Sequence, residues 1–165
     1  MKSVMISIQP QWCQLIASGK KTLEVRKTRP KLEAPFKVYI YCTKEKPGRK
    51  HQYEAFGLNG KPVQCGGYVI AEFICDDIRC FGVPYPAFQS KMDKSILGQS
   101  CLTYYQLHRY AYHDKLYGWH ISDLLIYAEP KNLAEFTGLR KTKFGYEPSK
   151  LERPPQSWRY VKEAL

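Results

Sequence analysis

Residues 19–26 read Gly-Lys-Lys-Thr-Leu-Glu-Val-Arg, so two ammonium groups, a hydroxyl, a carboxylate and a guanidinium fall within eight positions. The residues before them predict a short helix over 10–18, because proline suits a first helical turn and Gly19 suits the position after the last turn. From residue 22 onward polar and apolar side chains alternate. This pattern predicts a β-strand with Thr22, Glu24 and Arg26 on one face.

Two interpretations of this polar row are open. In most alternating strands the polar face is simply solvated. If the row instead lined a cleft, Glu24 and Arg26 would hold each other's charge state. Lys21, at the turn between helix and strand, would then bind an anion or act as an acid or base.

The spacing Gly-x-Lys-x-x-Glu-x-Arg, here Gly19, Lys21, Glu24 and Arg26, resembles the signature of the ASCH domain. This activating-signal-cointegrator homology domain belongs to the PUA-like superfamily, and the likeness is to its prokaryotic and phage type. The flanking sequence resembles the family's first strand, first helix, barrel strand and closing segments, at 3–9, 10–19, 67–76, 119–130 and 154–161. The resemblance implies a small PUA-like β-barrel with peripheral helices.

Length and composition predict a single domain over residues 1–165, α+β and mainly β, with loop insertions near 44–66 and 137–153. The 44% hydrophobic and 14% aromatic content excludes wholesale disorder. No apolar run approaches the ~18 residues of a membrane span. The N-terminus alternates like a strand and lacks the apolar core of a signal peptide. We therefore expect a cytoplasmic protein without a membrane partner.

Outside the motif, alternation and β-propensity predict strands over 4–8, 36–43, 68–74, 119–127 and 156–161. Thr103 and Gln106 form a capping box that starts a helix reaching Tyr110. A single helical turn is predicted over 132–136. The segment 76–96 is predicted to be turn-rich, and 139–155 to be a basic loop. The segment 44–66 is predicted to be mobile, either as a flap over the site or as a tolerated insertion.

The formal charge of +11 is unevenly placed. Residues 1–50 hold 12 Lys and Arg against 3 Asp and Glu, and residues 131–165 hold 8 against 4. Residues 51–130 hold 6 against 8. This segregation favours a polyanion as the partner, although lysine-rich loops also serve solubility.

Six cysteines stand at positions 13, 42, 65, 75, 80 and 101. They form no Cys-x-x-Cys pair, and no zinc template arises with His108, His113 or His120. We expect thiols that are mostly buried and not disulfide-bonded, and we expect no metal and no cofactor.

The first functional hypothesis is an RNA- or nucleotide-binding domain, because PUA-like barrels typically hold RNA or an extruded base. The ligand would lie in a basic cleft at the barrel mouth, held by Lys21, Glu24 and Arg26 beside Lys20 and Thr22. Stacking on bases would use aromatic residues drawn from Trp12, Trp119, Trp158, Tyr39 and Tyr41. Phosphate contacts would add Lys27 and Arg29.

Glu72 lies on an otherwise apolar strand. It is predicted either to face outward or to sit at the mouth near Arg26 or a lysine.

The second hypothesis is a hydrolase that uses Lys21 and Glu24. One ASCH-like branch that this chain resembles hydrolyses N4-acetylcytidine with a lysine, matching Lys21, and a threonine nucleophile. Glu24 stands where that threonine would be, and Thr22 occupies a neighbouring position, so we expect slow hydrolysis or none. A Lys21–Glu24 pair would still suit acid–base work on an amide, or a ribonuclease-like reaction on RNA. A third hypothesis, a protein-interaction module, rests only on the reuse of folds.

Overall fold

The computed structural model describes residues 1–45 and 65–164. The predictions made for segment 46–64, mobility and a flap, lie outside these residues. The elements follow one another as β1 (Lys2–Ile8), α1 (Pro10–Ala17), β2 (Leu23–Arg26), β3 (Phe36–Cys42), β4 (Val69–Cys75), β5 (Ile78–Phe81), η1 (Pro86–Lys91), α2 (Lys94–Ser100), α3 (Tyr104–Ala111), β6 (Leu116–His120), β7 (Ser122–Lys131), η2 (Leu133–Glu135), β8 (Thr137–Thr142), β9 (Gly145–Lys150) and β10 (Trp158–Lys162).

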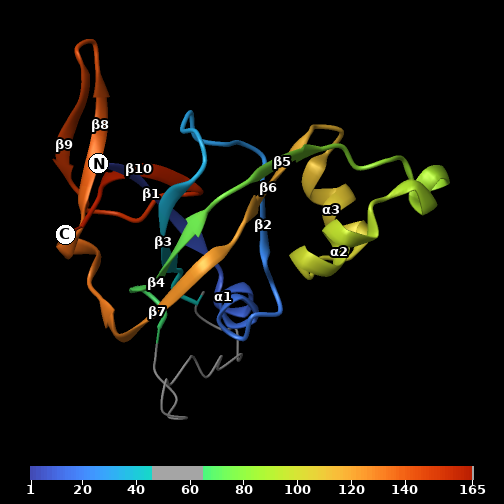
Figure 1. Ribbon diagram of the computed structural model, residues 1–165, viewed down its shortest axis with the longest axis horizontal. Helices are drawn as coiled ribbons and strands as arrows, with labels where there is room; N and C mark the ends of the chain where they lie inside the picture. The colour runs from blue at the N-terminus through green and yellow to red at the C-terminus, as the bar shows by residue number, and fades with distance from the viewer. Residues whose placement is uncertain (46–64, 165) are drawn as a thin grey trace.

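Two sheets organise these elements. The larger has the order β7-β4-β3-β1-β10-β8-β9, in which only β1 and β3 run parallel, and the smaller has the order β2-β6-β5. The fold is therefore mainly β with a few helices. The predicted closed barrel is not confirmed, because closure requires the edge strands of a sheet to pair. Among the described strands β7 and β9 remain the two edges, and Figure 1 shows the β8–β9 hairpin standing apart from β7.

The central strand β1 is buried on both faces. Val4 and Ile6 belong to the core cluster that α1 covers, and Met5 belongs to a second cluster on the opposite face with Tyr39. All four side chains are inaccessible to solvent. Because β1 and β3 form the middle of the large sheet, the residues at their carboxyl ends are held in a rigid frame.

A third core cluster determines the direction in which the side chains of β2 point. Leu23 and Val25 pack with Leu107 of α3 and Ile96 of α2. Because successive side chains of a strand point to opposite faces, Glu24 and Arg26 must point away from these helices, toward α1 and β1. The orientation of the motif is therefore fixed by its apolar residues.

Several sequence-based expectations are confirmed. Helix α1 carries Pro10 at its start, and Gly19 follows it with a φ of +74°. Helix α3 has the predicted capping box, in which Thr103 accepts from the backbone of Gln106. The single helical turn near residue 133 is also present. Apart from these expectations, none of the helices among residues 1–45 and 65–164 has the length and apolar character of a membrane span.

Three segment predictions are wrong. The turn-rich segment 76–96 contains β5 and the start of α2, which Asp93 caps through the backbone N–H of Ser95. The basic loop 139–155 contains most of a hairpin, β8–β9, whose turn uses Gly145 at a φ of +127°. The strand predicted over 119–127 is two strands, β6 and β7, which belong to different sheets. In each case pairing with a distant strand or packing on another element outweighed weak local signals.

Candidate functional site

The polar row of β2 is buried. Lys21 is 2% exposed and Glu24 is 6% exposed, and the side chain of Arg26 is 11% exposed. The interpretation of this row as an ordinary solvated strand face is therefore wrong. A buried row of charges must be internally paired, since desolvation of an unpaired charge is very costly.

Lys21 is held by three oxygens. Its Nζ donates to the carbonyl of Ser100 at 2.7 Å and to that of Leu23 at 3.0 Å, and it lies 3.3 Å from Oε2 of Glu24. An ammonium group has three donors, and these three oxygens match them. Lys21 thereby ties the end of α2 to the beginning of β2. Its Nζ also lies 5.4 Å from the centre of the Trp12 ring.

Glu24 and Arg26 continue the same chain of contacts. Oε1 of Glu24 lies 2.9 Å from one terminal nitrogen of Arg26, and this nitrogen also donates to the carbonyl of Ser7 at 2.7 Å. The other terminal nitrogen donates to Oγ of Ser157 at 3.4 Å. The buried Nε of Arg26 has no hydrogen-bond partner within the part of the chain that the structure describes. Three of the five guanidinium N–H groups are therefore engaged, which leaves the one on Nε and one on the terminal nitrogen that contacts Ser157.

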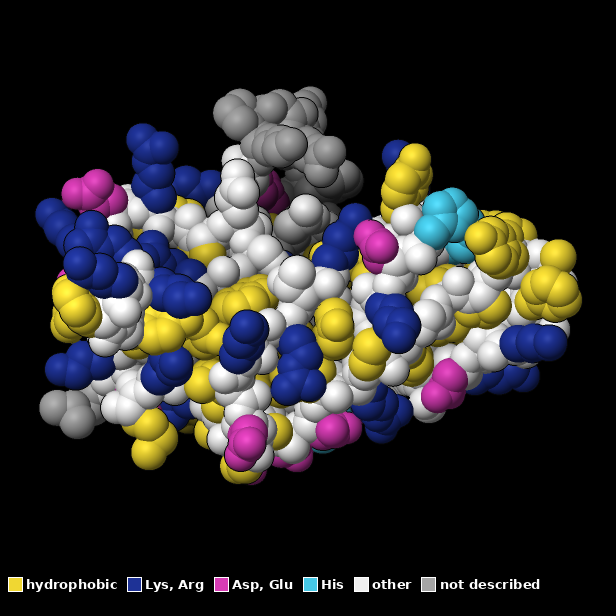
Figure 2. All heavy atoms as spheres, turned by 90° about the horizontal axis from the view of Figure 1, so that it is seen from above, with side chains coloured by type: hydrophobic (Ala, Val, Ile, Leu, Met, Phe, Trp, Pro, Cys, Tyr) yellow, Lys and Arg dark blue, Asp and Glu magenta, His cyan; other side chains and the backbone are white. Residues whose placement is uncertain are grey.

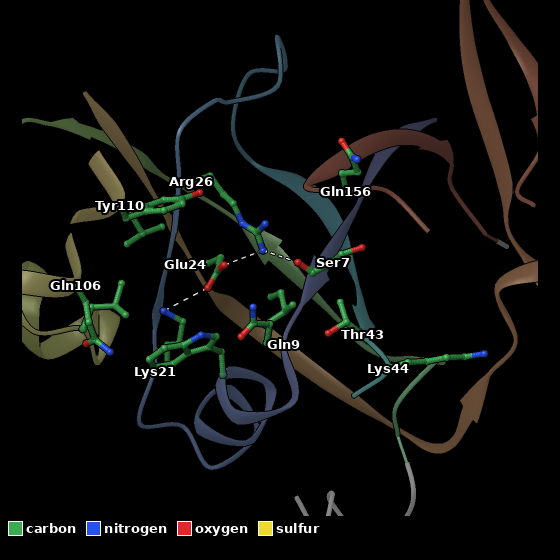
Figure 3. Close-up of a pocket in the computed structure, with 14 residues that line it drawn as sticks. Ser7, Gln9, Lys21, Glu24, Arg26, Thr43, Lys44, Gln106, Tyr110 and Gln156 are labelled. Atoms are coloured by element: carbon green, nitrogen blue, oxygen red, sulfur yellow. Dashed lines mark hydrogen bonds and ion pairs between the residues drawn. The ribbon is translucent and has the colours of Figure 1, made fainter. Parts of the chain in front are cut away.

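These three side chains line one pocket, which is drawn in Figure 3. The volume of the pocket is about 530 Å³. The end of β1 and the residue after it contribute Ser7 and Gln9, and α3 contributes Gln106 and Tyr110. The other lining residues come from β1, α1, β2, the chain just after β3 and segments near 102 and 156: Ile8, Trp12, Val25, Thr43, Lys44, Leu102 and Gln156. The pocket thus combines a buried carboxylate between two cations with aromatic rings and several side-chain amides.

Of the predicted site residues, the structure brings Lys21, Glu24, Arg26 and Trp12 together in this pocket. Lys20 is exposed, and Thr22 is fixed through its backbone, which bonds to Gln99 and Ile121. Neither residue lines the pocket, and Trp158 does not line it either. Trp158 packs instead on the rings of Trp119 and Tyr160.

Three of the aromatic residues that we expected to stack on bases cannot do so. Trp119 and Tyr39 have no accessible surface, and Tyr41 is 5% exposed. They fill the cores on the two faces of the large sheet. Of the pocket's two large aromatic side chains, sequence analysis identified Trp12 and missed Tyr110.

Glu72 lies outside the pocket, in a separate cluster on β4. Its carboxylate accepts from the hydroxyl of Tyr127 at 2.6 Å and lies 3.1 Å from Nζ of Lys37. Burial opposes ionisation of Glu72, but the hydrogen bonds from Tyr127 and Lys37 outweigh burial and lower the pKa of its carboxyl. Glu72 therefore has a lysine neighbour, but it does not line the pocket with Arg26, and its predicted place in the ligand site is not found.

The amides of Gln9, Gln106 and Gln156 were missed in the sequence. They come from three separate segments, and no periodicity or spacing relates them. Only the docking of α3 and of the chain before β10 onto the end of β1 brings them together. The local sequence assigns Gln106 only a role in the capping box of α3.

The cysteines are mostly buried, as predicted. Cys13, Cys42, Cys65 and Cys75 are buried, whereas Cys80 is exposed and Cys101 is partly exposed. Burial raises the pKa of the Cys75 thiol to about 12, so this group is an unreactive core residue. In the described ranges no group of three His, Cys, Asp or Glu side chains is arranged to hold a metal ion.

Comparison with known proteins identifies the fold. No family profile and no curated protein matches the sequence. The structure, however, is similar to solved structures of an ASCH protein from Zymomonas mobilis. The native form shares 20% identity at a TM-score of 0.56, with 98% of this chain and 88% of that chain covered. A Tyr-to-Phe variant of the same protein gives 19% identity, a TM-score of 0.56 and coverage of 99% and 92%. The chain therefore has the fold of an ASCH domain.

Proposed function

We propose that this ASCH-fold domain binds RNA and holds one nucleotide in the pocket formed around Lys21, Glu24 and Arg26. The observation that carries the proposal is the buried carboxylate of Glu24, which is fixed between two cations and faces a pocket with aromatic walls. A volume of about 530 Å³ lies within the usual range of small-ligand sites, roughly 300–1,000 Å³. Aromatic walls and convergent amides are the groups with which proteins hold unpaired RNA bases.

The polar groups of the pocket favour a base with an exocyclic amine. Each carboxylate oxygen of Glu24 accepts one protein contact, and a carboxylate offers about four acceptor positions. Glu24 can therefore accept from the amine of cytosine or adenine, which is how carboxylates recognise cytosine. The guanidinium of Arg26, which lines the same pocket, suits an acceptor atom of the same ligand.

The hydrolase hypothesis is less well supported by this geometry. Lys21 would have to exchange a proton with a substrate, but its three donors are directed at Ser100, Leu23 and Glu24. Each oxygen of the Glu24 carboxylate likewise already contacts a cation, Oε2 that of Lys21 and Oε1 that of Arg26. The pocket is better suited to holding a ligand than to transferring protons.

Replacing Trp12 with alanine is expected to weaken binding of cytidine monophosphate about tenfold, because stacking of a base on an aromatic ring contributes about 1–3 kcal/mol. Isothermal titration calorimetry of the native and variant proteins gives both dissociation constants. Tyr105→Ala is the matched control, since Tyr105 is 67% exposed on α3 and does not line the pocket. The proposal fails if millimolar cytidine and adenosine monophosphates show no saturable binding. It also fails if a folded Trp12→Ala protein binds like the native one.

A further inference from the structure

A second set of aromatic and basic side chains lies outside the pocket, on β1, β10 and the β8–β9 hairpin. We call it the aromatic–lysine surface and define it as Lys2, Lys141, Tyr146, Trp158, Tyr160 and Lys162. Lys2 lies directly opposite Lys162, and Lys141 lies directly opposite Tyr146, so each pair shares a face of the sheet. The proposed pocket uses none of these residues.

The aromatic residues of this surface form a continuous row. The ring centres of Trp158 and Tyr160 are 5.4 Å apart, and those of Tyr160 and Tyr146 are 5.1 Å apart. The Nζ of Lys2 lies 4.2 Å from the Tyr146 ring and 4.8 Å from the Tyr160 ring. Trp158 and Tyr160 are partly exposed, and Tyr146 is 39% exposed. The row therefore offers ring surface and an ammonium group to the same ligand.

One end of the row lies next to Ser157, which contacts the pocket residue Arg26. Arg26 contacts Ser157, Trp158 donates from Nε1 to Oγ1 of Thr28 at 2.9 Å, and the backbone N–H of Lys31 donates to the hydroxyl of Tyr160 at 2.7 Å. Three successive contacts thus hold the segment 26–31 alongside the segment 157–160. A chain that leaves the pocket beside Arg26 would meet Trp158 and then Tyr160.

The charge of this region is positive. Figure 2 shows Lys and Arg side chains gathered at the end of the molecule where the β8–β9 hairpin lies, with hydrophobic side chains between them. Glu147 is the acidic residue of the hairpin, and it pairs across the strands with Arg140. Because adjacent cross-strand pairs point to opposite faces, Glu147 lies on the face opposite Lys141 and Tyr146.

We infer that the aromatic–lysine surface binds the single-stranded RNA segment next to the nucleotide held in the pocket. This inference rests on the proposed function, because it assigns the pocket one nucleotide of the same strand. Aromatic rings that stack bases, with cations that follow the phosphates, are the features of single-strand binding surfaces. Duplex RNA fits less well, because its bases are already stacked on each other and are not available to the rings.

The test compares two ligands, cytidine monophosphate, which reaches only the pocket, and an unstructured cytidine-rich oligoribonucleotide of about ten residues. The double variant Lys2→Glu/Lys141→Glu and the single variant Tyr146→Ala are each expected to weaken oligonucleotide binding at least fivefold. Both should leave the mononucleotide dissociation constant unchanged. For the double variant, the plot of log binding constant against log salt concentration should also be less steep, by a slope of about 1.4, since two phosphate contacts are lost. Fluorescence anisotropy at several salt concentrations measures these quantities.

The matched controls are Lys94→Glu/Lys115→Glu and Tyr105→Ala, which make the same changes at exposed positions near α2 and α3. Equal weakening by the surface variants and their controls would overturn the inference, because it would indicate a diffuse charge effect. Unchanged oligonucleotide binding in Tyr146→Ala would overturn it as well. If the mononucleotide does not bind to the native protein but the oligonucleotide responds as expected, the pocket proposal fails and the RNA-binding surface stands without it.

Discussion

Replacing Lys21 with alanine is expected to lower the free energy of unfolding by about 3–5 kcal/mol, the usual loss when one partner of a buried ion pair is removed. The variant would leave two backbone carbonyls and the Glu24 carboxylate without the donor that they share. For a domain of this length the loss corresponds to a melting temperature lower by about 6–20 °C. Urea denaturation followed by circular dichroism measures the change directly.

The adjacent residue provides the control. Lys20 carries the same side chain, is exposed and lies outside the pocket, so Lys20→Ala should change stability by less than about 0.5 kcal/mol. A large difference between two neighbouring lysines is expected only if one is buried and the other is solvated. Equal and small effects of the two substitutions would contradict the buried arrangement of the β2 row.

The substitution Glu24→Gln is expected to abolish the preference of the pocket for cytosine over uracil. In the proposed complex Glu24 accepts from the amine of cytosine and would repel the O4 carbonyl of uracil. Cytidine monophosphate should therefore bind about tenfold more tightly than uridine monophosphate, within the roughly 1–3 kcal/mol that a good base contact contributes. A glutamine can turn its amide and donate to O4, so the variant should bind both nucleotides about equally. Calorimetric titration of each protein with each nucleotide gives the ratio of the two dissociation constants for the native protein and for the variant.

Glu33→Gln makes the same chemical change at an exposed loop position, and this variant should keep the native preference for cytidine over uridine monophosphate. The stability of Glu24→Gln must be measured in parallel, since the substitution leaves Lys21 and Arg26 without their shared anion. Equal affinity of the native protein for the two nucleotides would refute the role assigned to Glu24. So would a folded Glu24→Gln variant that keeps the native preference.

Local signals in the sequence predicted the helix–turn–strand unit that carries the motif. Proline and glycine bracketed α1, and alternation placed Glu24 and Arg26 on one face of β2. Alternation could not determine whether this face was solvated, because that depends on α1, β1 and the chain around Ser157 packing over it. The carbonyl of Ser100, which fixes Lys21, lies 79 positions away along the chain.

The other incorrect predictions also concern features that depend on contacts between distant segments of the chain. The β8–β9 hairpin has weak strand signals, with many charges and Pro148, and it forms because it pairs with β10 at the edge of the large sheet. Trp119 and Tyr39 looked suitable for base stacking because the sequence does not distinguish an aromatic residue in the core from one in a cleft. Tyr110 lines the pocket because α3 packs beside β2, and the local sequence does not reveal this contact.

The most direct test of the proposed nucleotide site is the NMR resonance of the Arg26 side-chain Nε–H during titration with cytidine monophosphate. This N–H is buried and has no acceptor among the described residues, and the Arg26 side chain lines the pocket, so a nucleotide that engages the guanidinium should shift this resonance. We predict that the Arg26 resonance shifts saturably, with the dissociation constant that calorimetry gives, while that of Arg159, outside the pocket, does not move. An Arg26 resonance that stays unchanged at saturation, with shifts confined to other parts of the protein, would contradict the account.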